Sequence, residues 1–175
     1  LEEARTLEGE PLVHAELDRT LGTLYAQLGH LDRADSLLQS SLDGKRALYG
    51  PEHLEVGKAL VEMGSVRLAA GEVDEAEKFV RDGLAMILRT APHRSEAVPE
   101  AMAVLGQVLA VRGEYPEAAA TLRDALARME RDKASDKSVA EGLHELANVE
   151  FYAGNYAASD SLNRRVLAVT RRLHG

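Results

Sequence analysis

A pattern of small residues recurs along the chain at intervals of 42 residues and, at the last step, of 41. In the first copy these residues are Gly22, Gly29 and Ala34. The equivalent residues of the later copies are Gly64, Gly71 and Ala76, then Gly106, Gly113 and Ala118, then Ala147, Gly154 and Ser159. A repeat of this length cannot bury its apolar face alone, so successive repeats must stack on one another. The interval therefore predicts a solenoid with its function on the surface.

Each repeat predicts two antiparallel helices joined by a short turn. Glycine just past a helix end supplies the left-handed conformation with which many helices terminate. The second glycine of each repeat fits this role, at Gly29, Gly71, Gly113 and Gly154. The expected helix pairs are 12–28 with 31–48, 53–70 with 73–90, 95–112 with 115–132, and 137–153 with 156–173. The prediction is an all-α chain of helical hairpins.

The first glycine of each repeat lies inside a predicted helix, where it costs about 1 kcal/mol relative to alanine. Gly22, Gly64 and Gly106 share this position. Because the cost is repeated, we expect a crossing at which two helices approach too closely for a side chain. The expected partners are small residues near the start of the second helix, namely Ala34, Ala76, Ala118 and Ser159.

Composition and charge exclude several classes of protein. The formal charge is −8, so the clustered basic surface of a nucleic-acid-binding protein is not expected. The chain has no cysteine, which excludes disulfides and thiolate metal sites. No apolar run reaches the roughly 18 residues of a spanning helix, so we expect no membrane insertion of this segment. The cytoplasm is the expected compartment, and the periplasm is left open.

No motif in the sequence predicts catalysis. Residues 144–148 (HELAN) begin like a helical zinc-protease motif, but Asn148 replaces the second histidine. The other histidines occupy different repeat positions, and the glycines are spaced singly rather than in a phosphate-binding loop. We therefore expect no enzyme activity, no metal and no cofactor.

The repeat resembles the tetratricopeptide repeat family. Leu21, Gly22, Tyr25, Gly29 and Ala34 match its helix pattern, and the resemblance covers nearly the whole chain. The 42-residue interval and the connector 48–53 (LYGPEH) look like the longer variant found in kinesin light chains and in many bacterial regulatory proteins. The resemblance implies a right-handed α-solenoid of antiparallel helix pairs that serves protein–protein interaction.

We expect residues 1–175 to be a single tetratricopeptide-repeat segment cut from a longer protein. The helical pattern of residues 1–9 predicts the tail of a preceding helix. The end of the chain, 171–175 (RRLHG), matches 46–50 (RALYG), a stretch that leads into another repeat. The repeats are expected at about 12–50, 51–92, 93–134 and 135–175.

One face of the first helix in each repeat should be free for a partner. With the interior glycine (or Ala147) numbered 8, positions 4, 7, 8 and 11 form the packing stripe. Positions 2, 5, 6, 9 and 13 point the opposite way, and by the resemblance they line a concave groove. Polar side chains at position 9 can pair with the backbone of an extended peptide. The predicted peptide-binding residues are Arg19, Thr23, Lys58, Glu62, Ser65, Gln107, His144, Asn148 and Tyr152.

The charges on this face predict the chemistry of the partner. The cations Arg19 and Lys58 lie in the first half, whereas carboxylates dominate the second half. The Lys, Asn and Arg clamp with which some family members bind chaperone C-termini is absent. We expect a protein or peptide with a basic or mixed-charge segment, anchored on Phe151 and Tyr152.

Two functions are open at this level. The first is an interaction or scaffold module of a larger bacterial regulatory protein, which binds an extended peptide or a partner domain in its groove. The second is a structural spacer, or a segment that self-associates end to end through uncovered apolar faces, without a specific ligand. An enzyme with a hidden site is the least favoured reading.

Overall fold

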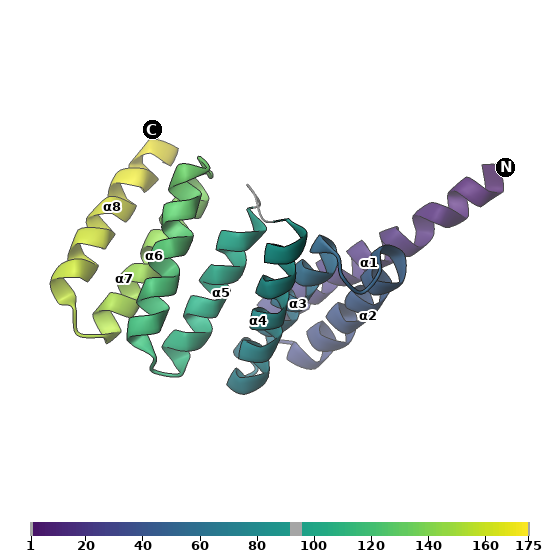
Figure 1. The fold of residues 1–175 in the computed structure, drawn as a ribbon, viewed down its shortest axis with the longest axis horizontal. Coiled ribbons are helices and arrows are strands. Elements are labelled where there is room, and N and C mark those ends of the chain that lie inside the picture. The colour runs from purple at the N-terminus through teal and green to yellow at the C-terminus, as the bar shows by residue number, and fades with distance from the viewer. Residues whose placement is uncertain (1, 92–95, 175) are drawn as a thin grey trace. The chain divides into compact units, whose positions relative to one another are not determined.

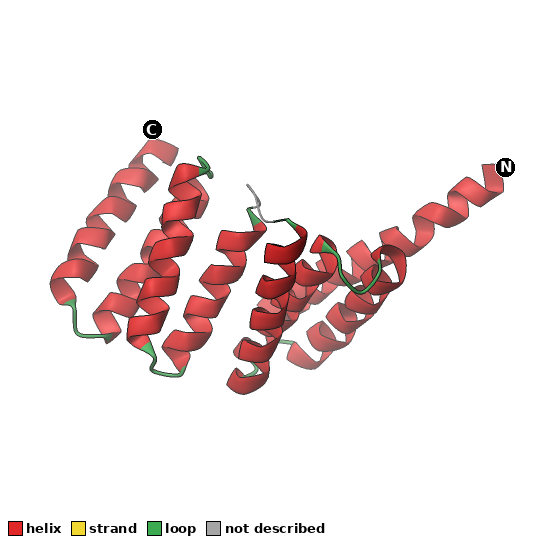
Figure 2. Ribbon diagram, in the orientation of Figure 1, coloured by secondary structure: helices red, strands yellow, loops and turns green. Residues whose placement is uncertain are grey.

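The computed structural model describes the backbone of residues 2–91 and 96–174, and the side chains of 11–91 and 96–172. All regular structure in these residues is α-helical (Figures 1 and 2). The helices are α1 (Glu2–Gln27), α2 (Leu31–Tyr49), α3 (Leu54–Ala69), α4 (Val73–Thr90), α5 (Ala97–Val111), α6 (Tyr115–Arg131), α7 (Asp136–Tyr152) and α8 (Tyr156–His174). The prediction of an all-α fold built from helix pairs is confirmed.

The chain forms two compact units, which we call unit 1 (Leu1–Pro92) and unit 2 (His93–Gly175). In unit 1, α1 packs on α2, α2 on α3, and α3 on α4. The same serial order holds for α5 to α8 in unit 2. The first helices of consecutive repeats also touch, α1 with α3 and α5 with α7. Each unit is thus two stacked hairpins.

The hairpin turns are closed by glycine in the left-handed conformation. Gly29 has a φ of 77°, and the other three turn glycines have φ of 81° to 82°. After Gly29, the amide of His30 donates to the carbonyl oxygen of Tyr25 at 2.9 Å, which satisfies one of the last carbonyl groups of α1. The left-handed helix ends predicted from the sequence are confirmed.

The interior glycines mark close helix crossings, but the nearest contact is not the expected one. A Cβ atom added to Gly22 would lie 2.8 Å from Cγ of Leu38 and 3.3 Å from the backbone oxygen of Ala34. At Gly106 the three nearest atoms all belong to Leu122, with Cγ at 2.6 Å. The prediction that the small residue is the partner needs correction, because the closest neighbour lies one turn further along the second helix. Sequence periodicity does not give the rotation of that helix.

The expected small residues are nevertheless buried. Ala34, Ala76 and Ala118 are 0% exposed, and Ser159 is also buried. At Gly64 the backbone oxygen of Ala76 would lie only 3.0 Å from an added Cβ atom. Small side chains are therefore needed on both helices of the crossing.

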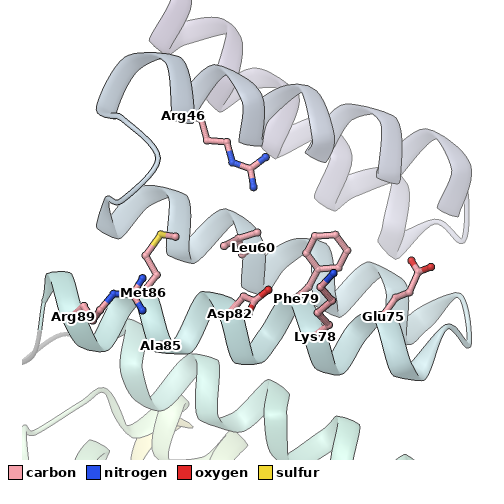
Figure 3. A pocket seen from close by; sticks show the side chains of 9 residues that line it. All are labelled: Arg46, Leu60, Glu75, Lys78, Phe79, Asp82, Ala85, Met86 and Arg89. Atoms are coloured by element: carbon pink, nitrogen blue, oxygen red, sulfur yellow. The ribbon is translucent and has the colours of Figure 1, made fainter.

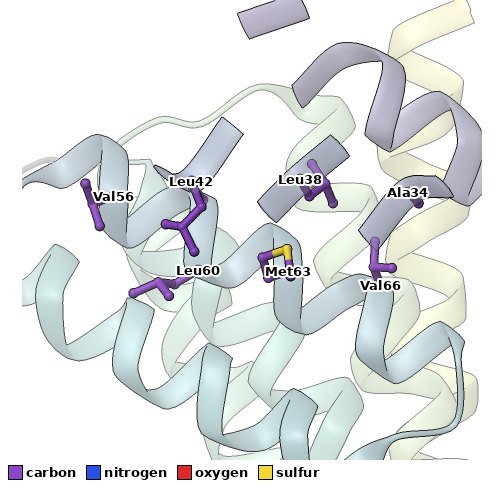
Figure 4. Packing of buried hydrophobic residues seen from close by; sticks show 8 residues of the cluster. Ala34, Leu38, Leu42, Val56, Leu60, Met63 and Val66 are labelled. Atoms are coloured by element: carbon purple, nitrogen blue, oxygen red, sulfur yellow. The ribbon is translucent and has the colours of Figure 1, made fainter. Parts of the chain in front are cut away.

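The core of unit 1 lies between α2 and α3 (Figure 4). Its buried members are Ala34, Leu38 and Leu42 of α2, with Val56, Ala59, Leu60, Met63 and Val66 of α3. Because α2 belongs to the first repeat and α3 to the second, this cluster is the contact that stacks one repeat on the next.

The first helix is longer than expected from the sequence. Residues 2–27 form one helix with Pro11 inside it, whereas the sequence predicted a break between a helix tail at 1–9 and a new helix near residue 12. A proline inside a helix removes one backbone hydrogen bond, which favours a break. The neighbouring stretch 2–10 (EEARTLEGE) consists largely of strong helix formers, and the helix continues through the proline. The other helix ends lie within a few residues of the predicted bounds.

Candidate functional site

We use the name A-face for the solvent-exposed side of the first helices of the repeats, α1 and α3 in unit 1 and α5 and α7 in unit 2. The predicted peptide-binding residues divide between the two units. Unit 1 carries Arg19, Thr23, Lys58, Glu62 and Ser65, and unit 2 carries Gln107, His144, Asn148 and Tyr152. All nine are at least partly exposed. In contrast, Val61, at the same repeat position as Arg19, is buried against α4.

The A-face of unit 1 carries a network of ion pairs that joins α1, α2 and α3. Arg19 of α1 donates from Nε to Glu16 at 2.8 Å and from Nη1 to Glu62 of α3 at 3.4 Å. Lys58 Nζ lies 2.8 Å from Glu55 of the same helix. The two cations predicted to bind a peptide are thus already neutralised within the unit.

Lys45 of α2 is the third cation of this network. Its side chain is almost fully buried, and its Nζ lies 3.0 Å from Glu16 of α1 and 3.7 Å from Glu55 of α3. The sequence analysis missed this residue, although a signal was present. The equivalent positions of the next two repeats hold the buried apolar residues Ile87 and Met129, so a lysine there marks a departure.

Two glutamates of this network, Glu16 and Glu62, have pKa values that are shifted in opposite directions. Burial tends to raise the pKa of Glu16, but hydrogen bonds and charge from Arg19 and Lys45 outweigh it and lower the pKa below the usual value of 4.5. Burial raises the pKa of Glu62, and the attraction of Arg19 only partly opposes the shift. One oxygen of Glu62, Oε2, is buried without a hydrogen-bond partner among the described residues, which agrees with this direction.

The polar residues at position 9 are less available than the sequence suggested. The hydroxyl of Thr23 donates to the carbonyl of Arg19 at 2.9 Å, and that of Ser65 donates to Val61 at 3.3 Å. Both donors are therefore engaged by the preceding turn of their own helix.

Unit 2 presents a different A-face. Asn148 lies 3.2 Å from the Nε2 atom of His144, one turn earlier on the exposed side of α7. Gln107 of α5 is half-buried, and Val111, near the end of α5, is exposed. Arg19, which pairs with Glu62 across α1 and α3, has Ala103 at the equivalent position of α5, so this cross-helix ion pair has no counterpart at that position. The A-face of unit 2 exposes apolar, amide and imidazole groups, together with the carboxylates of Glu141 and Glu145 on α7.

An exposed aromatic cluster closes one end of unit 2. We define it as Tyr115, Phe151, Tyr152 and Tyr156. The Tyr152 ring stacks on Tyr115 of α6 with centroids 6.4 Å apart, and Phe151 meets Tyr156 edge-on at 5.3 Å. Tyr152 is 68% exposed and Phe151 is 54% exposed. The sequence named Phe151 and Tyr152 but missed Tyr156, which follows the hairpin turn after α7, and Tyr115, which comes from α6 of the preceding repeat.

Unit 1 also has a hollow of about 640 Å³ on the side of the second helices (Figure 3). Arg46 of α2 lies on one wall, and Phe79 and Met86 of α4 lie on the other. Leu60 of α3 contributes to the floor. Charged side chains of both signs line the wall formed by α4, so the hollow does not select one sign of ligand charge.

Neither a metal site nor a membrane span is found in the part of the chain that the structure describes. In residues 11–91 and 96–172, whose side chains are described, no three His, Asp or Glu side chains are grouped as metal ligands. The described helices include none of sufficient length and apolar character to cross a bilayer.

Stacked helical hairpins with an exposed face on their first helices define a class, the helical-repeat proteins that act in protein–protein interaction. Members of this class are typically scaffolds rather than enzymes. Two profiles described as tetratricopeptide repeat match the sequence, one over residues 14–89 and one over residues 100–131 and 139–175. The chain belongs to the tetratricopeptide repeat family. The resemblance predicted from the interior glycines is confirmed.

Solved structures share the fold at low sequence identity. BtubC (BKLC) from P. vanneervenii has a TM-score of 0.80 at 16% identity, covering 99% of this chain and 74% of the other. A kinesin light chain with nearly identical TPR-like repeats, from Podosopora anserina, has a TM-score of 0.77 at 20% identity, covering 93% and 77%.

A third similar structure is the Rap conjugation gene regulator of plasmid pLS20 in complex with the Phr* peptide. Its TM-score is 0.75 at 16% identity, and the match covers 91% of this chain but only 43% of the regulator. No protein of curated function matches the sequence.

Proposed function

We propose that the chain is a protein-interaction module whose A-face in unit 2 binds an extended segment of a partner protein. The segment carries apolar side chains and at least one arginine or lysine. The observation that carries the proposal is the exposed aromatic cluster at the end of an acidic helix face. Tyrosines of this kind dominate binding energy in many protein interfaces.

The chemistry of α7 supports a basic segment. Glu141, Glu145, Asn148 and Tyr152 follow one another at intervals of three or four residues, so they lie along one side of the helix. A cation placed over the Tyr152 ring gains a cation–π contact, and the carboxylates two and three turns earlier on α7 attract further basic side chains of the segment. Val111 of α5, exposed on the A-face of the same unit, offers an apolar contact for a neighbouring side chain.

The ion-pair network of unit 1 supports the choice of unit 2. An acidic peptide would have to displace Glu16, Glu55 or Glu62 from Arg19, Lys45 and Lys58. The peptide carried by the similar Rap regulator supports a peptide as the class of ligand. We place the module in a larger bacterial regulatory protein of the cytoplasm and expect the isolated chain to show no catalytic turnover.

The proposal is tested by selecting peptides from a random display library and measuring their affinity by fluorescence anisotropy. We expect the selected peptides to be enriched in arginine, lysine and apolar residues. Tyr152→Ala should weaken their binding about tenfold or more, because loss of a central aromatic contact costs on the order of 2 kcal/mol. Glu145→Lys should weaken it as well, through repulsion of the basic side chain.

Tyr49→Ala is the matched control, because Tyr49 is an exposed tyrosine of unit 1. It should leave affinity unchanged. Selection of acidic peptides, or binding that survives both Tyr152→Ala and Glu145→Lys, contradicts the proposal. A library that yields no binder favours the alternative of a spacer without a specific ligand.

A further inference from the structure

The hollow of unit 1 lies between two second helices, and we call it the B-groove. Its walls are α2 and α4 and its floor is α3, so all three helices that form it are interior members of the stack. Leu60, Phe79 and Met86 give the groove an apolar strip. Leu60 is buried, whereas Phe79 and Met86 are half-buried and pack against the core between α2 and α3. The rest of both side chains is open to a ligand.

Two opposite charges face each other across the B-groove without pairing. Arg46 extends from α2 toward the wall of α4, which carries Asp82 (Figure 3). Arg46 is paired instead with Asp43 of its own helix, at 3.3 Å. In the part of the chain that the structure describes, Asp82 has no ion pair or hydrogen bond. The groove thus offers a hydrogen-bond donor on one wall and an acceptor on the other.

The equivalent groove of unit 2 is closed by an ion pair. Two repeats later along the chain, the positions of Arg46 and Asp82 hold Glu130 of α6 and Arg165 of α8. Nη2 of Arg165 lies 2.5 Å from Oε1 of Glu130. Both residues line two smaller hollows, of about 410 and 490 Å³, so their pair divides the groove. Charges at these two positions can therefore meet across a groove, and in unit 1 they leave it open.

A donor that faces an acceptor suits the main chain of an extended peptide. Each peptide group has a carbonyl oxygen, which accepts from a guanidinium, and an N–H group, which donates to a carboxylate. A charged side chain placed between Arg46 and Asp82 would be attracted by one and repelled by the other. The other charged residues of the α4 wall, Glu75, Lys78 and Arg89, lie toward the ends of the groove (Figure 3). The middle of the groove therefore favours an uncharged segment.

The dimensions of the B-groove favour an extended segment over a helix. From Phe79 to Met86 the strip on α4 is about 10 Å long, which is the length of about three extended residues. The volume of about 640 Å³ lies among those of pockets that enclose small ligands, roughly 300–1,000 Å³. Two turns of helix with their side chains already occupy roughly 850–1,200 Å³.

We propose that the B-groove binds an uncharged, apolar segment of a partner protein in an extended conformation. Arg46 and Asp82 bind peptide groups of the segment, and its apolar side chains pack on Phe79 and Met86. This ligand differs in charge from the basic segment proposed for the A-face of unit 2, and neither proposal depends on the other.

The probe is a random octapeptide display library, selected on the Tyr152→Ala variant so that the A-face of unit 2 does not contribute. The selected peptides are synthesised with blocked termini and titrated by fluorescence anisotropy, and we expect them to be apolar and uncharged. Each amide of the peptide is then replaced in turn by an ester, which removes one N–H donor. One such replacement should weaken binding about tenfold, and it should have little effect once Asp82→Ala is added, because the acceptor is then gone.

The matched variant closes the groove. Arg46→Glu with Asp82→Arg installs the ion pair of unit 2 and should abolish binding without lowering the unfolding midpoint, because both residues are exposed. The control exchanges the signs of Glu130 and Arg165 and should bind like the Tyr152→Ala parent. The proposal is overturned if no peptide is selected, if the selected peptides are charged or helical, or if no ester effect depends on Asp82. Binding that survives the closed groove, or that the control abolishes, overturns it as well.

Discussion

At the scale of the residue, two glycines inside helices show where the packing has no room for a side chain and where it has. Gly64 lies at a crossing where a Cβ atom would press on the backbone oxygen of Ala76 at 3.0 Å and on the side chain of Val80. Gly142 also lies inside a helix, but its nearest neighbour would be the sulfur of Met129, at 3.4 Å and at the end of a flexible side chain. Both glycines lie inside a helix, but they occupy different repeat positions and have different surroundings.

We therefore expect opposite effects from the same substitution. Gly64→Ala should lower the free energy of unfolding by about 1–3 kcal/mol, because overpacking outweighs the gain in helix propensity. Gly142→Ala should leave it unchanged or raise it by up to about 1 kcal/mol. Urea denaturation of the two variants beside the parent measures both. Equal losses in the two would show that the crossing at Gly64 is not closer than the one at Gly142.

At the scale of the element, ion pairs between charged side chains join helices of neighbouring repeats. Arg67 of α3 lies 2.6 Å from Asp35 of α2, which joins the first repeat to the second. In unit 2, Glu150 of α7 pairs with Arg123 of α6. Here the carboxylate lies on the first helix of the later repeat and the cation on the helix before it, the reverse of the arrangement in unit 1. Asn155 also donates to Glu150, at 2.8 Å, so the buried carboxylate is satisfied. Arg67 and Glu150 stand at the repeat position of Tyr25, and the sequence does not show their partners.

The network joining α1, α2 and α3 predicts a pH dependence with two opposite signs. Because the pKa of Glu62 is raised on folding, its carboxyl contributes stability below pH 4.5 and loses that contribution as the pH rises through the raised value. The stability of the parent relative to Glu62→Gln should thus fall from acidic to neutral pH. Denaturant unfolding at several pH values measures this difference.

Glu16→Gln is the matched comparison on the same network. The pKa of Glu16 is lowered on folding, so its contribution is present above pH 4.5 and is lost as the pH falls through the lowered value. The advantage of the parent over Glu16→Gln should therefore shrink on acidification. The same trend for both variants would contradict the assignment of the two glutamates.

At the scale of the whole molecule, the exposed faces of the first helices differ between the two units. Unit 1 carries an ion-pair network that joins α1, α2 and α3, and the proposed peptide surface is formed by α5 and α7 of unit 2. Repeat proteins allow this division, because each repeat contacts only its neighbours and local surfaces vary without changing the fold.

We therefore expect changes in the two units to have separable effects. Glu16→Gln in unit 1 should leave the affinity for the selected basic peptides unchanged, and Tyr152→Ala in unit 2 should leave the pH dependence of stability unchanged. Anisotropy titrations and denaturant unfolding of both variants measure this. Loss of peptide binding in Glu16→Gln would show that unit 1 contributes to the peptide surface.

Much of the fold and part of the site could be predicted from the sequence alone. The period, the helix pairs and the turn glycines follow from spacing, because a helix turn and a left-handed cap impose local requirements that each repeat must meet. Phe151 and Tyr152 could be named as an anchor for the same reason, since their repeat position gives the side of the helix. Tyr115 and Tyr156 could not, because their closeness depends on how three helices meet.

The sequence by itself determined the repeated helical hairpin and its turns. The tertiary structure decided which positions of the first helices are exposed and which polar groups there are available. Val61 is buried against α4, Arg19 and Lys58 are engaged by carboxylates, and Lys45 enters the network from a second helix. The physical reason is the separation along the sequence over which each effect operates. The helix period and the helix caps depend on residues a few positions apart, whereas ion pairs and burial depend on contacts between helices.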